Sequence, residues 1–203
     1  MPVKRVGGHR ERQADATKSQ IARAARALFA EHGYAGTTIT AISAAADIPV
    51  QTVYSSLGSK AKILERITQS WMEEAQTVSL AQASLQETDV RRQLRLLAEL
   101  NRRQYEVGSD VVAIYQDAAR ADPQMADTLR QVLAAREREI RKFLRTTARH
   151  HKPGLTLEGA LDITLALTLV EVYRTLVVER GWSARRYEGW LGGSLIAQLL
   201  DDS

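Results

Sequence analysis

The sequence predicts an all-α protein of about nine helices, and three observations support this fold class. Apolar residues recur at the three- and four-residue spacing of a helix face along most of the chain. Alternating apolar and polar segments joined by Gly/Asn hairpin turns do not occur. Gly, Pro and helix-capping residues separate the helical segments. With 203 residues, 44% of them hydrophobic, the chain is large enough for one or two domains.

The composition excludes several classes of site. The chain has no cysteine, which excludes disulfides, thiolate zinc sites, iron–sulfur clusters and a cysteine nucleophile. Its longest stretch without Asp, Glu, Lys or Arg has 15 residues, 32–46, and carries polar side chains, so it cannot span a bilayer. No apolar segment follows the basic N-terminus, so we expect no signal peptide and a cytoplasmic location.

Positive charge is concentrated in the N-terminal third. Residues 1–66 carry ten Lys/Arg and five Asp/Glu, a net charge of +5, whereas residues 67–203 have a net charge of −1. This asymmetry favours a polyanion partner for the first part, although a soluble surface that happens to be basic would look the same. Residues 1–13 lack apolar periodicity and are expected to form a disordered basic arm.

Four helices are expected before the middle of the chain. Gly33 suits a left-handed C-cap, and the Thr38 hydroxyl suits an N-cap. Pro49 suits a helix entrance because its fixed φ and missing N–H cost little there. Ser59 follows a glycine break and can cap the next helix. The expected helices cover about 15–33, 39–45, 50–55 and 60–81.

Five further helices complete the chain. The breaks between them fall at Gly108, Pro123, Pro153 and Gly181. The expected helices cover about 90–105, 110–120, 126–148, 156–180 and 183–200.

The two short helices, joined by a tight turn behind an amphipathic helix, predict a helix-turn-helix. Ala45 and Ala46 are small where the helices must approach, and Ile42, Ile48 and Val53 can close the core between them. The second short helix then projects outward and can enter a major groove.

The polar residues of this segment suit DNA. Glutamine can bond an adenine edge at two atoms, and the methyl groups of Val and Thr can contact a thymine methyl. The hydroxyl and ammonium groups nearby can contact phosphates. The plainer interpretation is that these are surface and core residues of a three-helix unit. The base-facing candidates are Val50, Gln51, Thr52 and Ser55, and the phosphate-facing candidates are Thr38, Tyr54, Ser56 and Lys60.

At this point the segment resembles the TetR family of transcriptional regulators. The resemblance is closest over about residues 15–66, and a weaker similarity lies near Tyr173, Trp182 and Trp190. Family members often have Gly where this chain has Asp47, which must therefore take a left-handed turn. They often have an aromatic residue where this chain has Ser56. The motifs that carry the resemblance are IARAARALF at 21–29, Gly33-Tyr34, TTITAI at 37–42, VQTVY at 50–54 and Gly58-Ser59-Lys60.

The resemblance implies a homodimer of all-α subunits. Residues 14–66 would bind a palindromic operator, and residues 67–203 would dimerise and enclose a small-molecule pocket. Effector binding would then move the linking helix and release the DNA. The family pattern adds Thr40 to the base-facing candidates Val50, Gln51, Thr52 and Ser55.

The last two expected helices are apolar on most sides and must be buried on most sides. A four-helix interface between two chains would bury them, although an intrachain core would do the same. The interface candidates are Leu169, Tyr173, Trp182, Tyr187, Trp190, Leu191 and Leu195.

Bulky residues on the helices that line pockets in similar proteins are candidates for effector contact, with ordinary core packing as the alternative. No cofactor and no metal site are expected, because the adjacent His150 and His151 point apart or lie in a loop. The effector candidates are Trp71, Met72, Tyr105, Tyr115, Phe143 and Tyr173.

These observations predict a ligand-responsive DNA-binding regulator, most simply a homodimeric repressor. A helical-bundle enzyme is disfavoured, since the sequence has no Glu-x-x-His pair, glycine-rich phosphate loop or Gly-x-Ser-x-Gly elbow. An architectural DNA-binding protein without an effector is the remaining alternative.

Overall fold

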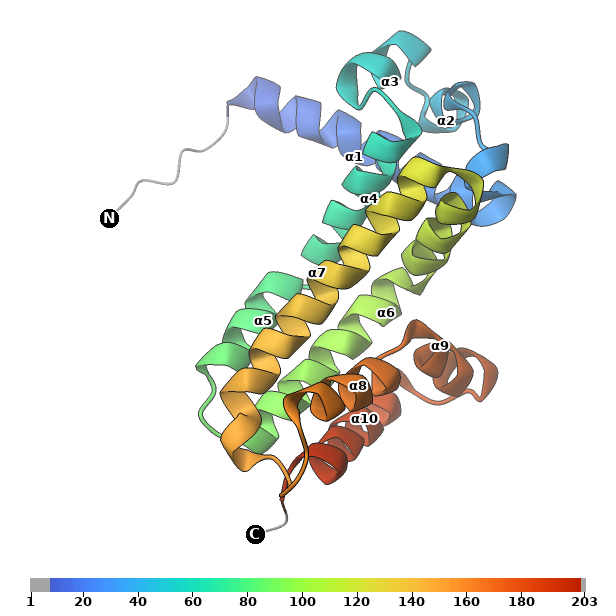
Figure 1. Cartoon of the computed structure of the whole chain (residues 1–203). Helices are drawn as coiled ribbons and strands as arrows, with labels where there is room; N and C mark the ends of the chain where they lie inside the picture. The colour runs from blue at the N-terminus through green and yellow to red at the C-terminus, as the bar shows by residue number, and fades with distance from the viewer. Residues whose placement is uncertain (1–7, 202–203) are drawn as a thin grey trace. The chain divides into compact units, whose positions relative to one another are not determined.

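A computed structural model gives the structure of the chain and describes residues 8–201. Every regular element in this range is a helix (Figure 1), which confirms the predicted all-α class. There are ten α-helices in the range, together with a 3₁₀ turn, η1 (Ala148–His150), and a π-helical segment, η2 (Arg174–Glu179). The α-helices are α1 (His9–Gly36), α2 (Ile39–Ala46), α3 (Val50–Ser56), α4 (Lys60–Glu74), α5 (Thr77–Gln86), α6 (Val90–Ala121), α7 (Pro123–Thr147), α8 (Leu157–Leu167), α9 (Val170–Tyr173) and α10 (Ala184–Leu199).

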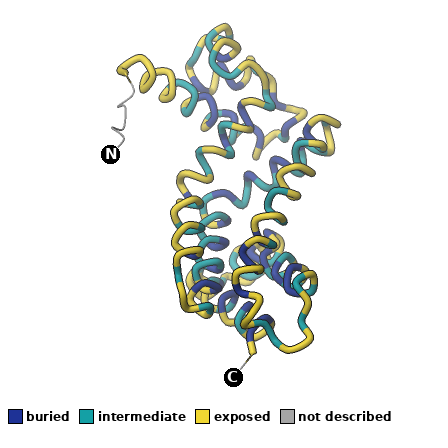
Figure 2. The backbone as a smooth tube through the Cα atoms, turned by 60° about the vertical axis from the view of Figure 1, so that its left-hand side comes forward, coloured by how far each residue is buried: buried dark blue, intermediate teal, exposed yellow. Residues whose placement is uncertain are grey.

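Helix α1 begins earlier than predicted. The sequence predicted a disordered arm over residues 1–13, of which 1–7 lie outside the described residues, but the helix already includes His9. Its first turns are exposed (Figure 2), so they lack the apolar pattern by which a buried helix is recognised. A local contact replaces packing here, because the Glu11 carboxylate accepts the Gly8 N–H at 3.0 Å. An acidic group in the first turn also favours the helix dipole.

Two helices predicted as continuous are interrupted. The predicted helix 60–81 is divided into α4 and α5 at Gln76, which adopts a left-handed conformation with φ of 55°. The predicted helix 156–180 stops at Thr168, and the chain resumes as α9 after an extended Leu169. Neither point carries a Gly or Pro, so local sequence signals gave no warning of a break.

The predicted break at Gly108 is a kink between two helical stretches that together are assigned as α6. Residues 90–121 form one helix, α6, with non-helical backbone angles at Gly108. A Cβ at this position would lie 2.1 Å from Nε1 of the Trp71 indole, so the close approach of this side chain requires a glycine. The kink therefore results from a packing contact between α4 and α6.

The contacts divide the chain into two compact units. Unit 1 comprises residues 1–70 and 113–126, and unit 2 comprises residues 71–112 and 127–203. The contiguous division into residues 14–66 and 67–203 stays a prediction. Unit 1 also contains residues 113–126, which follow part of unit 2 in the sequence. A division of the chain at one point therefore cannot describe both units.

Each unit has its own buried side chains. In unit 1 the core unites apolar residues of α1 to α4 with the returning segment 113–126, for example Ile21, Phe29, Ile42, Val53 and Ile114. In unit 2 one hydrophobic cluster includes residues of α6, α7, α8, α9 and α10, and α8 packs beside α10 (Figure 1). No helix of residues 8–201 is long and apolar enough to cross a membrane.

Candidate nucleic-acid interface

The turn between α2 and α3 has the geometry that a helix-turn-helix needs. Asp47 takes the left-handed conformation expected of it, with φ of 50° and ψ of 46°. Its N–H bonds the Ala44 carbonyl at 3.2 Å, and the Ser43 hydroxyl donates to the Ile48 carbonyl at 2.6 Å. The Gln20 amide donates from α1 to the Ala46 carbonyl at 2.7 Å, a contact the sequence analysis missed. Most of the open hydrogen-bonding groups at this helix end are therefore satisfied inside the domain.

Helix α3 presents a polar face from a packed base. Val53 is 1% exposed and fixes the helix against the core, together with the buried Ile42 of α2. Gln51 and Ser55 are exposed, and the Tyr54 ring is half exposed. Val50, Thr52 and Ser56 are of intermediate exposure. Of the base-facing candidates of α3, Gln51 and Ser55 are thus fully accessible, whereas Val50 and Thr52 are partly covered.

Helix α2 begins at the predicted cap. The Thr38 side chain accepts the Ala41 N–H at 3.1 Å, so its hydroxyl proton stays available to a phosphate. Thr40 is exposed on the first turn of the same helix. The neighbouring Thr37 is buried, and its hydroxyl donates to the Gly33 carbonyl at 2.8 Å, which closes the connection between α1 and α2.

Lys60 has a role inside the domain that differs from the predicted phosphate contact. Its ammonium donates to the carbonyls of Tyr34 at 2.6 Å and Thr37 at 3.1 Å, and it lies 4.4 Å from the centre of the Tyr34 ring. Burial lowers the pKa of Lys60, with the nearby charge of Asp122 acting in the opposite direction. These contacts support a positioning role for Lys60 at the connection between α1 and α2, and its contact with phosphate stays a prediction.

The returning segment of α6 holds the same connection from another side. The Tyr34 N–H donates to Oδ2 of Asp117 at 2.8 Å. Gly33 has φ of 75°, and a Cβ there would lie 3.0 Å from Asp117 Oδ2, so this carboxylate needs the glycine beside it. Thr68 of α4 donates its hydroxyl proton to the Tyr115 hydroxyl at 3.0 Å. Sequence analysis could not find these pairs, because the partners are far apart in the chain.

The six effector candidates do not form one group. Tyr115 belongs to unit 1, whereas the other five belong to unit 2. Trp71 is half-buried and its indole N–H donates to the Gln104 carbonyl at 2.6 Å. Met72 is 41% exposed. Tyr105, Phe143 and Tyr173 are buried in the cluster of unit 2. A role in effector contact stays a prediction for these residues.

Unit 2 contains a small apolar hollow of about 120 Å³ between α5, α6 and α7. Phe143 is the effector candidate that lines it, beside Leu97, Leu100 and Ile140. Ligand pockets for drug-sized molecules usually measure roughly 300–1,000 Å³. A larger ligand would therefore require the helices around the hollow to move.

Four of the seven interface candidates are used inside a single chain. Tyr173, Tyr187, Leu191 and Leu195 are at most 4% exposed and pack within the core of unit 2. This packing favours the intrachain alternative for these four side chains, and a role in a dimer interface stays a prediction. Leu169 is 44% exposed, and Trp182 and Trp190 are of intermediate exposure. These three remain the accessible candidates for contact with a second subunit.

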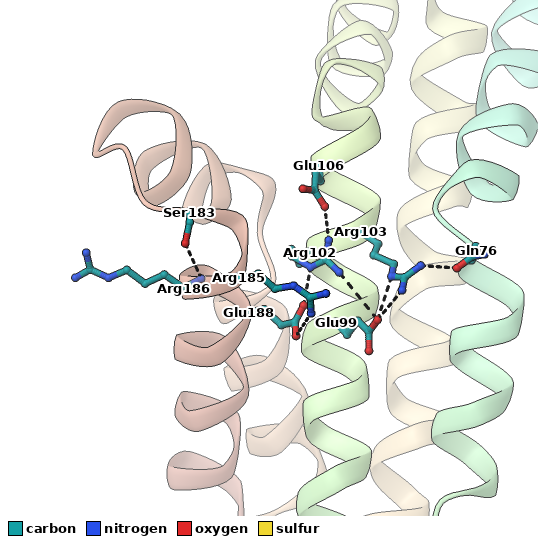
Figure 3. Close-up of polar contacts among 9 residues, drawn as sticks. All are labelled: Gln76, Glu99, Arg102, Arg103, Glu106, Ser183, Arg185, Arg186 and Glu188. Carbon is teal, nitrogen blue, oxygen red and sulfur yellow. Dashed lines mark hydrogen bonds and ion pairs between the residues drawn. The ribbon is translucent and has the colours of Figure 1, made fainter.

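A buried ion-pair network joins α6 to α10 (Figure 3). The Arg102 side chain is 7% exposed, and its Nε donates to Glu188 at 2.6 Å. Arg102 also pairs with Glu106, and the exposed Arg185 pairs with Glu188 at 3.3 Å. Each buried charge has a partner, as burial of a guanidinium requires. Sequence analysis did not identify this network, because it depends on the packing of helices separated by 86 residues.

The helix-turn-helix segment matches a known family. Residues 21–67 match the family model described as bacterial regulatory proteins, tetR family. These residues therefore form a DNA-binding segment of the TetR type. The matched range includes α2, α3 and the turn at Asp47, and it confirms the resemblance predicted from the sequence. The TetR family is one of DNA-binding transcriptional regulators, which confirms the helix-turn-helix and the assignment to transcription regulation.

Solved TetR-type structures share the fold over nearly the whole chain. The fatty acid degradation regulator FadR from Bacillus halodurans has a TM-score of 0.72 at 18% identity, covering 89% of this chain and 94% of that one. The SmeT–triclosan complex has a TM-score of 0.71 at 20% identity, covering 93% of both chains. A putative regulator from Saccharomonospora viridis, in complex with choline, has a TM-score of 0.68 at 18% identity, covering 91% and 97%. At these identities the likeness establishes the fold.

Among curated proteins no sequence matches the chain.

Proposed function

We propose that this TetR-family protein is a homodimeric, ligand-responsive repressor. In this proposal unit 1 binds a palindromic DNA operator and a small-molecule effector in unit 2 releases it. The protein then acts in the cytoplasm and has no enzymatic activity. The fold of a transcriptional regulator is the established part, whereas the repressor action, the operator and the dimer are what we propose.

One observation supports DNA recognition most directly. The turn at Asp47 is closed by hydrogen bonds with residues of α1 and α2, and Val53 anchors α3 in the core. A helix held in this way presents Gln51 and Ser55 outward without further rearrangement. A pre-ordered recognition helix loses little conformational entropy on binding, which suits specific contact with base edges.

Two further observations support the other parts of the proposal. Solved proteins of the same fold were crystallised with triclosan and with choline, which is consistent with a ligand-binding role for unit 2. The accessible Leu169, Trp182 and Trp190 offer apolar area to a second subunit. A dimer is also expected from binding energetics, because a single three-helix unit makes few contacts with DNA.

Selection of bound sequences from a random duplex DNA pool tests the proposal. The purified full-length chain is used at moderate salt, and a variant with proline at Val53 serves as a control whose α3 cannot form. We expect a palindrome with half-sites about one helical turn apart, roughly 34–36 Å. The control should retrieve no such palindrome.

Enrichment without any palindrome would contradict the proposal. Binding with little sequence preference would favour the second candidate, an architectural DNA-binding protein without an effector, for which the basic N-terminal third is the supporting feature. The size of the protein bound to one operator, measured by light scattering, separately tests whether two chains bind together.

A further inference from the structure

The carbonyl of Thr168, at the break between α8 and α9, accepts hydrogen bonds from three side chains of unit 2. The Tyr105 hydroxyl donates to it at 2.8 Å, an Nη of Arg136 at 2.8 Å and the Asn101 amide at 3.3 Å. Arg136 also bonds the Thr168 hydroxyl at 2.6 Å. Side chains of α6 and α7 thus donate hydrogen bonds to one residue, Thr168, at the end of α8.

These donors are fixed in place. Asn101 and Tyr105 are 5% and 7% exposed, and the fully buried Tyr187 donates to the Asn101 amide oxygen at 2.7 Å, which orients the amide toward Thr168. Burial raises the pKa of Tyr105, opposed by the nearby charge of Arg136, so the hydroxyl keeps its proton at neutral pH. The cluster is therefore a preorganised set of donors, one of them cationic.

A backbone carbonyl is a poor complement to this donor set. Its oxygen has two lone pairs, whereas three donors converge on it. It also carries no formal charge to balance the Arg136 guanidinium, which finds both of its hydrogen-bond partners in the described chain on Thr168. A carboxylate offers two oxygens with about four lone-pair sites and a negative charge, and would satisfy the same donors better.

The same carbonyl has another partner available in an unbroken helix. In a continuous α8–α9 helix the Thr168 oxygen would accept the Val172 N–H. The sequence of 156–180 has helical periodicity and no Pro, and it predicts this continuous helix. Instead, α9 begins as a separate helix at Val170, after the extended Leu169. Release of Thr168 from the side-chain donors would let the helix close.

Apolar surface lies along the same two helices. Leu97 lies one turn of α6 before Asn101 and Leu100 directly precedes it, and Ile140 and Phe143 follow Arg136 by one and two turns of α7. These four side chains line the hollow of about 120 Å³. A ligand with an anionic head and a short apolar tail would match the order of donors and apolar groups along these helices.

We infer that Asn101, Tyr105 and Arg136 form the effector's anchoring site, that the effector is a carboxylate with an apolar tail, and that its head group replaces the Thr168 carbonyl. This inference rests on the proposed function, in which unit 2 binds an effector. Replacement frees Thr168, and α8 and α9 join into one helix. Without effector, the Thr168 carbonyl therefore occupies the three donors and competes with the effector's head group for them.

Binding of octanoate to the full-length protein, measured by calorimetry, tests the anchor. We expect Arg136→Met to weaken binding about tenfold or more, since a hydrogen-bonded charge is lost. Tyr105→Phe removes one donor with almost no change of shape and should weaken it about fivefold. Arg138→Met, at an exposed position on the same helix, should bind as the wild type does. Length-matched 1-octanol and octyltrimethylammonium should bind at least about tenfold more weakly than octanoate.

Hydrogen–deuterium exchange tests the helix closure independently. Octanoate should slow the exchange of the amides of residues 169–172, and 1-octanol should leave them unchanged. Because Tyr105→Phe preserves packing, it keeps this readout available if Arg136→Met fails to fold. Equal affinity of wild type and both variants, absent binding of octanoate, or unchanged exchange at 169–172 would each overturn the inference.

The two proposals fail separately. A palindromic operator together with no octanoate binding would reject the carboxylate anchor and leave the repressor in place. Octanoate binding that depends on Arg136, in a protein that selects no operator, would reject the repressor and retain the anchoring site.

Discussion

The backbone N–H of Tyr34 donates to the carboxylate of Asp117 at 2.8 Å, although the two residues are 83 positions apart. Tyr34 lies near the end of α1, and its carbonyl accepts a hydrogen bond from the Lys60 ammonium at 2.6 Å. The backbone N–H and the backbone carbonyl of Tyr34 are thus held by side chains of α6 and α4, respectively. The entrance to the helix-turn-helix is consequently fixed by contacts within unit 1, and the contact from Asp117 comes from outside the matched residues 21–67.

Replacement of Asp117 tests this contact. Asp117→Ala should lower the free energy of unfolding by about 1–3 kcal/mol, because the Tyr34 N–H loses a charged acceptor, and it should weaken DNA binding. Asp127→Ala is a matched control, since Asp117 and Asp127 each pair with an arginine three residues later. The control should change stability by less than about 1 kcal/mol, as an exposed ion pair does. Equal losses in urea unfolding of the two variants would contradict the contact.

Lys60→Met distinguishes a positioning role from a phosphate contact. If Lys60 holds the carbonyls of Tyr34 and Thr37, the variant should be less stable and bind DNA more weakly, with an unchanged dependence of log Kd on log salt. A phosphate contact would instead reduce that slope by about 1 for each lost contact. Lys62→Met, which removes only an exposed pair with Glu65, provides the control. A reduced slope for Lys60→Met alone would refute the positioning role.

Because Trp71 packs closely against Gly108, replacement of glycine by alanine should change stability in opposite directions at Gly108 and at an open helical position. Gly108→Ala should destabilise the protein by about 1–3 kcal/mol, because the new Cβ would overlap the indole. Gly193→Ala, in α10 with no heavy atom near its would-be Cβ, should instead stabilise by about 0.5–1 kcal/mol. Thermal unfolding of both variants checks the difference. A stabilising effect at Gly108 would show that the indole does not pack there.

His151 predicts a pH dependence of stability. Burial, followed by the neighbouring charge of His150, lowers the pKa of His151 below its ordinary value of 6.5. The unfolded chain therefore binds the proton first as the pH falls below about 6.5, and the stability present above this pH is progressively lost. We expect His151→Gln to flatten the change in urea-unfolding free energy between pH 7.5 and 5.5. His32→Gln, at an exposed site, should retain the wild-type dependence.

Gln51 is expected to select a base. Gln51→Ala should relax the preference at one position of each operator half-site, at a cost of about 1–3 kcal/mol per half-site. Tyr54→Phe, which removes a hydroxyl expected at phosphate, should weaken all operator variants by a similar factor. Binding measured across a panel of single-base operator variants separates the two patterns. Uniform weakening by Gln51→Ala would identify Gln51 as a backbone contact.

The helix-turn-helix could be predicted from the sequence because its signals are local. Thr38 caps the helix that follows it, Asp47 makes the left-handed turn, and Val53 is buried at the predicted spacing. Each of these outcomes depends on neighbours within a few residues. Residue spacing and side-chain chemistry were therefore enough to predict α2, α3 and the exposure of Gln51.

Contacts between distant helices decided the rest. The break at Thr168 has no Pro or Gly, and its carbonyl is held by Arg136, which lies 32 residues earlier in the chain. Apolar periodicity predicted that Tyr187 would be buried, but only the packing of unit 2 showed that its own chain buries it. Apolar periodicity indicates which face of a helix is buried, but it does not indicate which segment packs against that face. The sequence by itself therefore determined the fold class and the recognition helix, and the tertiary structure decided the helix interruptions, the contacts of Lys60 with Tyr34 and Thr37, and the donor cluster at Thr168.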